Sequence, residues 1–247
     1  MKVKNTTDIG TFLLCGKRGS GKTVLSQKVI KNLKVKKQNR FIISPTIDLD
    51  DTLHHLFHKE NRFNEYDEDI LDEILEVIKM DRKQKDEEFY FRINEDGERE
   101  RIQSRVGVKN PNYDEFVLML DDCIEALGGG VRPKKLARLV TRHRHYKLHV
   151  ILTTQYYTSV SPIIRVNIMK FYIFATNKKE IKKIADEHSI FNKPKDFEEY
   201  FREVTDEPYT PFIVNYFYKP RNIYDDNKEK PDTEELQTKP QRKKPME

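Results

Sequence analysis

The sequence element that most restricts the fold is an apolar segment followed by a glycine-rich loop and a segment of helical pattern. Residues 11–15 read TFLLC, residues 16–23 read GKRGSGKT, and a helix is expected over about 22–34. The loop matches G-x-x-x-x-G-K-S/T, the Walker A pattern, in the strand–loop–helix setting that gives the pattern its meaning. The combination predicts a phosphate-binding loop at the end of a buried strand.

The residue types of this loop suit the binding of a nucleoside triphosphate. Glycines let the backbone wrap closely around phosphate oxygens with consecutive N–H groups pointing inward, and the helix N-terminus adds a partial positive charge. Lys22 is expected to reach the β- and γ-phosphates, and the Thr23 hydroxyl to ligate Mg²⁺. The expected cofactors are therefore ATP and Mg²⁺. The expected binding residues are Gly16, Lys17, Arg18, Gly19, Ser20, Gly21, Lys22 and Thr23.

Apolar runs of strand length recur along the chain between segments of helical pattern. The runs are continuous rather than alternating, which is typical of parallel strands covered on both faces by helices. The fold class is therefore predicted to be α/β, with a mostly parallel sheet flanked by helices. The expected strands are 11–15, 41–44, 116–120, 148–153, 171–175 and 212–217, and the expected helices are about 22–34, 66–80, 133–143 and 178–188.

Two charged segments interrupt this pattern. Residues 81–110 carry eight basic and eight acidic side chains and suggest an exposed insertion such as a charged hairpin. Residues 220–247 hold seven bases, seven acids and four prolines, a composition that buries too little apolar surface to offset its ordering entropy. We therefore expect one P-loop ATPase domain over residues 1–218, with an insertion at about 81–110 and a disordered tail over 219–247.

A second acidic motif follows residues 116–120 (FVLML), which are directly followed by Asp121 and Asp122. A buried strand that ends in carboxylates has the form of a Walker B motif, because ligands lie at the carboxyl edge of a parallel sheet. Asp121 is expected to hold Mg²⁺ through water, and Asp122 to orient or deprotonate the attacking water. The alternative is a buried strand capped by a turn-forming pair of aspartates.

Gln155 follows the next predicted strand, LHVILTT. In P-loop ATPases with an extra strand between the Walker A and Walker B strands, a polar residue at this place senses the γ-phosphate. Gln155 is thus a catalytic candidate beside Lys22 and Asp122, although a glutamine at a strand end is otherwise an ordinary solvated residue.

These motifs, in their order and spacing, resemble the viral genome-packaging ATPases of the FtsK–HerA superfamily, most closely the poxvirus-type enzymes of large DNA viruses and their satellite viruses. The resemblance covers about residues 10–217 and also uses ISPT at 43–46, RHYKLHVILTTQYY and SPIIRVN. It implies a RecA-like core, a homo-oligomeric ring of five or six subunits, and ATP-driven threading of double-stranded DNA into a capsid. A capsid or portal vertex protein would be a further partner, and the host cytoplasm, the viral factory or the virion the location.

Positive charge is concentrated in residues 131–150, which hold seven bases and no acid. A localised basic face can contact DNA phosphates without reading bases, whereas the alternative is a solvated helix face. The DNA-contact candidates are Arg132, Lys134, Lys135 and Arg138. Ring ATPases often complete each site with an arginine from the neighbouring subunit. Arg144 is the first candidate for this role, followed by Arg142 and Arg165, and a surface ion pair is the alternative for each.

Composition excludes several other classes of protein. No apolar run approaches the ~18 residues of a membrane span, and two cysteines cannot form a disulfide framework or a four-thiolate zinc site. The remaining alternatives are another FtsK–HerA-type motor, in conjugation or phage assembly, a P-loop small-molecule kinase, and a nucleotide-binding switch with negligible hydrolysis. Stimulation of ATP hydrolysis by long duplex DNA would favour a motor.

Overall fold

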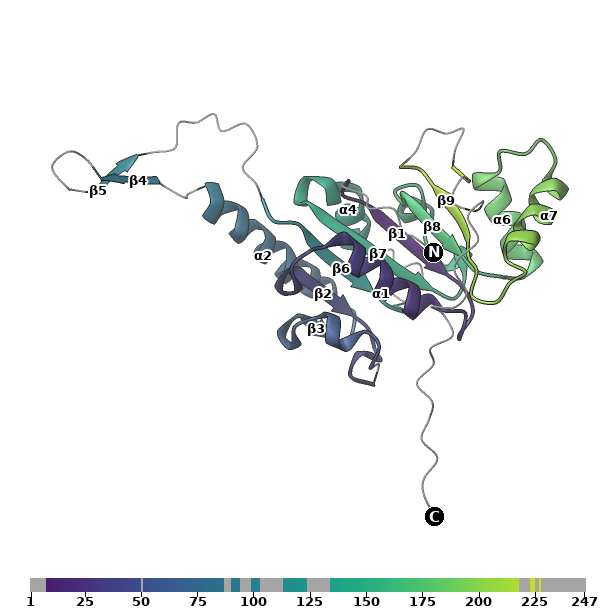
Figure 1. Cartoon of the computed structure of the whole chain (residues 1–247), viewed down its shortest axis with the longest axis horizontal. Helices are drawn as coiled ribbons and strands as arrows, with labels where there is room; N and C mark the ends of the chain where they lie inside the picture. The colour runs from purple at the N-terminus through teal and green to yellow at the C-terminus, as the bar shows by residue number, and fades with distance from the viewer. Residues whose placement is uncertain are drawn as a thin grey trace, which may run out of the picture.

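The computed structural model describes residues 8–49, 51–86, 90–93, 99–102, 113–123, 134–217, 223–224 and 227. Within these residues the main sheet has seven strands in the order β3-β2-β6-β7-β1-β8-β9 (Figure 1). Every neighbouring pair is parallel except β8 and β9. The strands are β1 (Thr11–Cys15), β2 (Arg40–Ile43), β3 (Arg62–Phe63), β6 (Phe116–Leu120), β7 (Leu148–Thr154), β8 (Lys170–Ile173) and β9 (Phe212–Asn215).

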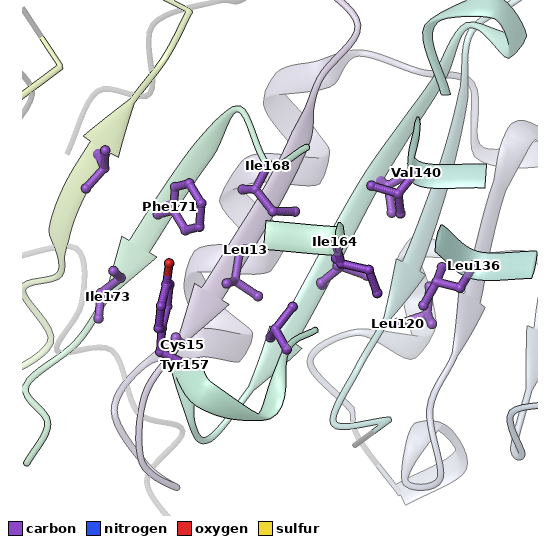
Figure 2. Packing of buried hydrophobic residues seen from close by; sticks show 14 of the residues in the cluster. Leu13, Cys15, Leu120, Leu136, Val140, Tyr157, Ile164, Ile168, Phe171 and Ile173 are labelled. Carbon is purple, nitrogen blue, oxygen red and sulfur yellow. The ribbon is translucent and has the colours of Figure 1, made fainter. Parts of the chain in front are cut away.

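Helices cover both faces of the sheet, as the continuous apolar strands require. On one face, Leu25, Val29 and Ile30 of helix α1 pack on side chains of β1, β2 and β6. Helices of the second face meet the opposite side of the same strands, where Leu136 and Val140 of α4 and Ile164 of α5 lie over the sheet (Figure 2). The helices are α1 (Lys22–Leu33), α2 (Glu68–Asp86), α4 (Lys134–Arg142), α5 (Pro162–Arg165), α6 (Lys178–His188) and α7 (Pro194–Val204).

The α/β fold with a mostly parallel sheet is confirmed, and all six expected strands and four expected helices are present, within two residues of the expected limits except at the end of α2. Strand β3, the four-residue helix α5 and the eleven-residue helix α7 were not expected, and neither were the short 3-10 helices of the described residues. The antiparallel direction of β9 was not expected either, because a buried strand has the same apolar pattern in both directions. No helix in the described part of the chain is long and apolar enough to cross a membrane.

The charged segment at 81–110 begins inside helix α2, which continues to Asp86 rather than ending near residue 80. Beyond it, strands β4 (Tyr90–Ile93) and β5 (Arg99–Ile102) form a separate antiparallel pair that lies away from the main sheet (Figure 1). This pairing agrees with the expectation of a charged hairpin. The rest of the segment lies outside the described residues.

The fold continues past the predicted domain boundary near residue 218. Tyr224 is 5% exposed and donates its hydroxyl hydrogen to the backbone oxygen of His188 at 2.5 Å. The Asn227 side chain accepts from the backbone nitrogen of Ile213 at 2.6 Å and donates to the oxygen of the same residue at 2.8 Å. In the described part of the chain, residues that contact the domain therefore continue to Asn227. Of the expected tail, residues 219–222, 225–226 and 228–247 lie outside the described residues.

Candidate nucleotide-binding site

The glycine-rich loop connects the carboxyl end of β1 to the first turn of α1. It is anchored to the neighbouring strand because the Gly16 nitrogen donates to the Thr154 oxygen at 3.0 Å. Gly19 and Gly21 have φ angles of 77° and 100°, a region that side chains disfavour. A Cβ atom at Gly16 would lie 2.7 Å from the Ser20 hydroxyl oxygen and 2.8 Å from Phe174 Cβ, and the fixed Phe174 Cβ leaves no room for it. The sequence motif therefore has the tight geometry on which phosphate binding depends.

The Lys22 ammonium lies inside the curve of this loop. Its Nζ donates to the Gly16 oxygen at 2.6 Å and to the Lys17 oxygen at 3.1 Å. Burial lowers the pKa of Lys22, and the charges of Asp122 and Asp121 act in the opposite direction. The lysine charge is thus held between the loop and the two carboxylates.

The donor groups of the loop fit a phosphate ligand. The Ser20 hydroxyl is buried and is among the few buried polar side-chain atoms of the described residues without a hydrogen-bond partner. A buried hydroxyl without a partner costs free energy unless a ligand satisfies it. Together with the closely curved backbone and the lysine charge, it gives the loop the chemistry of an anion site.

Asp121 directly follows β6 and has a fixed orientation. It is 9% exposed, and its Oδ1 accepts a hydrogen bond of 2.6 Å from the Thr153 hydroxyl. Its Oδ2 accepts one of 3.2 Å from the Ser44 hydroxyl. These two hydroxyls come from the strand ends on either side of β6, so the carboxylate is held by both neighbours. Such an oriented, partly buried carboxylate suits a metal ligand.

Asp122 turns out of the strand into a left-handed conformation with a φ angle of 52°. Its backbone nitrogen donates to the Thr153 hydroxyl at 3.0 Å, and its Oδ2 accepts from Gln155 Nε2 at 3.1 Å. The side chain is exposed, in contrast to that of Asp121. Strained residues of this kind gather at functional sites, and aspartate tolerates this conformation better than most residues.

The structure brings together four residues that the sequence predicted: Lys22, Asp121, Asp122 and Gln155. The strand order explains the meeting, because β7 lies between the Walker A strand β1 and the Walker B strand β6. Register places Cys15 beside Thr154 and Leu120 beside Leu152, so all three strands end at one edge.

Two residues that position Asp121 were not predicted, namely Ser44 and Thr153. Both are polar residues at the ends of buried strands that flank β6. The same rule that selected Gln155 would have found them, since neighbouring parallel strands bring their carboxyl ends together.

The arginine candidates lie at the opposite edge of the sheet. Arg144 precedes β7, is exposed, and donates from Nη2 to the Met169 sulfur at 2.9 Å. It lines an open cavity of about 740 Å³ at this edge. Within one chain, Arg144 is therefore separated from the phosphate-binding loop by the length of a strand. Arg142 is also exposed, at the end of α4.

Arg165 is held by ion pairs within its own chain, which does not suit an arginine that must contact the phosphates of a neighbouring subunit. It is 5% exposed, and its Nε and Nη2 donate to the two carboxylate oxygens of Glu187 at 2.9 and 2.8 Å. A third bond runs to the Val160 backbone oxygen. This arginine is structural: it joins helix α5 to helix α6.

The basic stretch is less uniform than its sequence suggests. Lys135 forms ion pairs with Asp69 and Asp72 of helix α2 at 3.0 and 2.6 Å. Hydrogen bonds to Asp72 and Asp69 raise the pKa of this lysine, so Lys135 is a poor candidate for contacting DNA. Arg138 is exposed on α4. Arg132 and the side chain of Lys134 lie outside the described residues.

Comparisons with known proteins give one family match and several structural neighbours that share the fold. The profile of a family described as poxvirus A32 protein matches residues 6–207. The genome packaging NTPase B204 of Sulfolobus turreted icosahedral virus 2, in complex with AMPPCP, is a structural neighbour with a TM-score of 0.57 and 15% identity, covering 86% of this chain and 95% of its own. The DNA-packaging ATPase B204 from Sulfolobus turreted icosahedral virus gives a TM-score of 0.54 at 16% identity, with the same coverage. No curated protein sequence matches the chain.

Proposed function

The chain belongs to the poxvirus A32 protein family, and from this membership we propose that it is an ATP-hydrolysing motor that moves double-stranded DNA into a viral capsid. The observation that carries the proposal is the meeting of Lys22, the two carboxylates and Gln155 at one edge of the sheet. The structural neighbours described as packaging NTPases share the fold that produces this edge.

ATP binding would use the loop from Gly16 to Thr23. Backbone N–H groups and the Ser20 hydroxyl would take the phosphate oxygens. Lys22 would exchange its two backbone acceptors for the β- and γ-phosphates, where its charge stabilises the transition state.

Mg²⁺ would be held by the Thr23 hydroxyl and, through water, by Asp121. The carboxylate orientation set by Thr153 and Ser44 fits this role. When bound, the metal ion supplies positive charge that neutralises the phosphate oxygens.

Asp122 and Gln155 would act on the attacking water. Their mutual hydrogen bond of 3.1 Å joins a proton acceptor to an amide that can contact the γ-phosphate. A change at the phosphate would then change the contact between the two side chains. We assign Asp122 the role of orienting or deprotonating water and Gln155 the role of sensor.

Assembly into a ring of five or six subunits would place an arginine of one subunit at the phosphates of the next. Arg144 fits this role better than Arg165, because Arg144 is exposed at the edge opposite its own loop whereas Arg165 is buried against Glu187. DNA would contact the basic stretch through Arg138, with Arg132 and Lys134 as further candidates. The site of action would be the host cytoplasm, the viral factory or the virion, and a capsid or portal vertex protein would be a further partner.

The test is steady-state ATP hydrolysis by the full chain with and without long duplex DNA. We expect Mg²⁺-dependent hydrolysis that duplex DNA stimulates, and almost none in a Lys22→Ala variant that folds normally by circular dichroism. Hydrolysis that is indifferent to DNA would contradict the motor and favour a kinase or a switch. More than a tenth of the wild-type rate in Lys22→Ala would contradict the assignment of the loop.

A further inference from the structure

An aromatic side chain that the proposed mechanism does not use lies against the phosphate-binding loop. Tyr209 belongs to the connection between helix α7 and strand β9. Because β9 runs antiparallel to β8, its first residue, Phe212, pairs with Ile173 at the end of β8. Because β9 is reversed, the connection that precedes it lies at the edge of the sheet where β1 ends and the phosphate-binding loop begins.

The tyrosine ring borders the loop at the start of α1. A Cβ atom built on Gly21 would lie 3.3 Å from Tyr209 Cδ1 and 3.6 Å from Tyr209 Cβ. Gly21 is the N-cap residue of α1 and precedes Lys22. Tyr209 therefore stands beside the backbone expected to hold phosphate, and 37% of it is exposed.

Packing alone does not explain this arrangement. Phe174, which is 3% exposed, already supports the loop from the core: its Cβ would lie 2.8 Å from a Cβ atom at Gly16. Tyr209 has a φ angle of 66°, a left-handed conformation that costs free energy for a residue with a side chain. Tyr209 is strained and partly exposed, and the buried Phe174 already packs against the loop. This combination points to a ligand that contacts Tyr209.

We propose that Tyr209 is the stacking platform for the base of the nucleotide whose phosphates the loop holds. The inference rests on the proposed nucleotide site and adds the subsite for the base. Aromatic rings bind bases through their π-faces, and such stacking depends little on the hydrogen-bonding edge of the base. The site should therefore accept adenine and guanine nucleotides with similar affinity, and pyrimidine nucleotides more weakly.

Binding measurements on the full chain test the proposal with two substitutions and two probes. Tyr209→Gly removes the ring and suits the left-handed backbone, whereas Tyr209→Phe keeps the ring. The probes are AMPPNP, which carries the base, and inorganic tripolyphosphate, which does not, both with Mg²⁺. We expect Tyr209→Gly to bind AMPPNP roughly tenfold more weakly. Tripolyphosphate affinity should be unchanged, and Tyr209→Phe should bind both probes like the wild type.

The possible outcomes distinguish a failure of the base subsite at Tyr209 from a failure of the whole nucleotide site. Wild-type affinity of Tyr209→Gly for AMPPNP, or an equal loss for both probes, would overturn the stacking role while leaving the nucleotide site in place. Failure of the wild-type chain to bind AMPPNP would overturn both. Photolabelling with 8-azido-ATP gives an independent measurement that does not depend on a variant. We expect the label on the peptide that spans 205–211, and its absence there would contradict the proposal.

Discussion

The Thr153 hydroxyl donates a hydrogen bond of 2.6 Å to the carboxylate of Asp121. The same hydroxyl oxygen accepts from the backbone nitrogen of Asp122 at 3.0 Å. One buried side chain on β7 therefore orients the first carboxylate and supports the turn that projects the second. Both proposed roles at the end of β6 depend on this threonine.

Replacing Thr153 by valine removes the hydroxyl and keeps the shape. We expect ATP turnover to fall by about 10- to 100-fold, as is typical when a residue that orients a metal ligand is lost. Nucleotide binding without Mg²⁺ should be unchanged. Thr11→Val is the matched control, because Thr11 is also fully buried on a central strand but bonds to the Asn167 oxygen at the other edge. Equal turnover in the two variants would contradict the positioning role.

Asp122→Asn should separate binding from chemistry. Asp121 keeps its two hydroxyl donors in this variant, so ATP and Mg²⁺ should bind while hydrolysis stalls. Equilibrium binding and single-turnover hydrolysis measure the two effects. Asp121→Asn is the comparison and should weaken Mg²⁺-dependent binding. If Asp122→Asn instead abolishes binding, the two aspartates have the opposite roles.

Arg144→Ala tests catalysis across a subunit boundary. The variant should bind ATP as an isolated subunit and hydrolyse it poorly in the ring. Mixing it with Lys22→Ala should restore activity, because some interfaces then pair an intact loop with an intact arginine. ATPase rates across mixing ratios measure this, once co-assembly of the two variants is established. Rates no higher than the weighted sum of the parents would refute Arg144, and Arg142 would be tested next.

Truncation tests the revised end of the domain. A chain that ends at residue 218 loses the buried Tyr224 ring and the Asn227 bonds to Ile213. We expect a loss of at least ~3 kcal/mol in the free energy of unfolding, the range for deleting a large buried side chain. A chain that ends at residue 228 should keep wild-type stability and ATP turnover. Urea denaturation of both chains checks this, and equal stability would restore the earlier boundary.

His188 should make the fold sensitive to acid. Burial lowers its pKa to about 4, from the ordinary value of 6.5. The unfolded chain therefore binds the proton first as pH falls, so stability is complete above pH 6.5 and declines toward pH 4, by roughly 2–3 kcal/mol. His188→Gln should make urea denaturation less dependent on pH across this window. Some dependence should remain, since burial also lowers the pKa values of His143 and His149. An unchanged slope would contradict the assignment.

The features that the sequence predicted share a physical reason. Residues 11–23 combine a buried strand, a glycine loop and a helix start, and only a few backbone geometries satisfy all three at once. Asp121, Asp122 and Gln155 could be placed together because parallel strands end at a common edge. In each case a local sequence pattern, combined with the rule that parallel strands end at a common edge, determined where the site residues lie.

The features that were missed depend on contacts between distant segments. Ile223 and Tyr224 form an apolar pair between charged and polar residues in the sequence, and only their packing against the core explains their burial. The left-handed backbone of Asp122 depends on a hydroxyl 31 positions away in the chain. Helix α7, by contrast, has a readable signal in Pro194 at its start and the buried pair Phe197 and Phe201, spaced one turn apart.

Strand β7 is hydrogen-bonded to a parallel neighbour on both sides, and its seven residues span about 23 Å at ~3.3 Å per residue. Gln155 follows one end, and Arg144 lies shortly before the other. Strand β7 should move as one rigid element, because the hydrogen-bonded strands on both sides keep it from bending. A shift imposed at the phosphate edge would appear at the arginine edge as a rigid rotation of the whole subunit. In the proposed ring, with Arg144 acting on the neighbouring subunit, the length of β7 would contribute to the distance between a subunit's own ATP site and the site that its arginine completes.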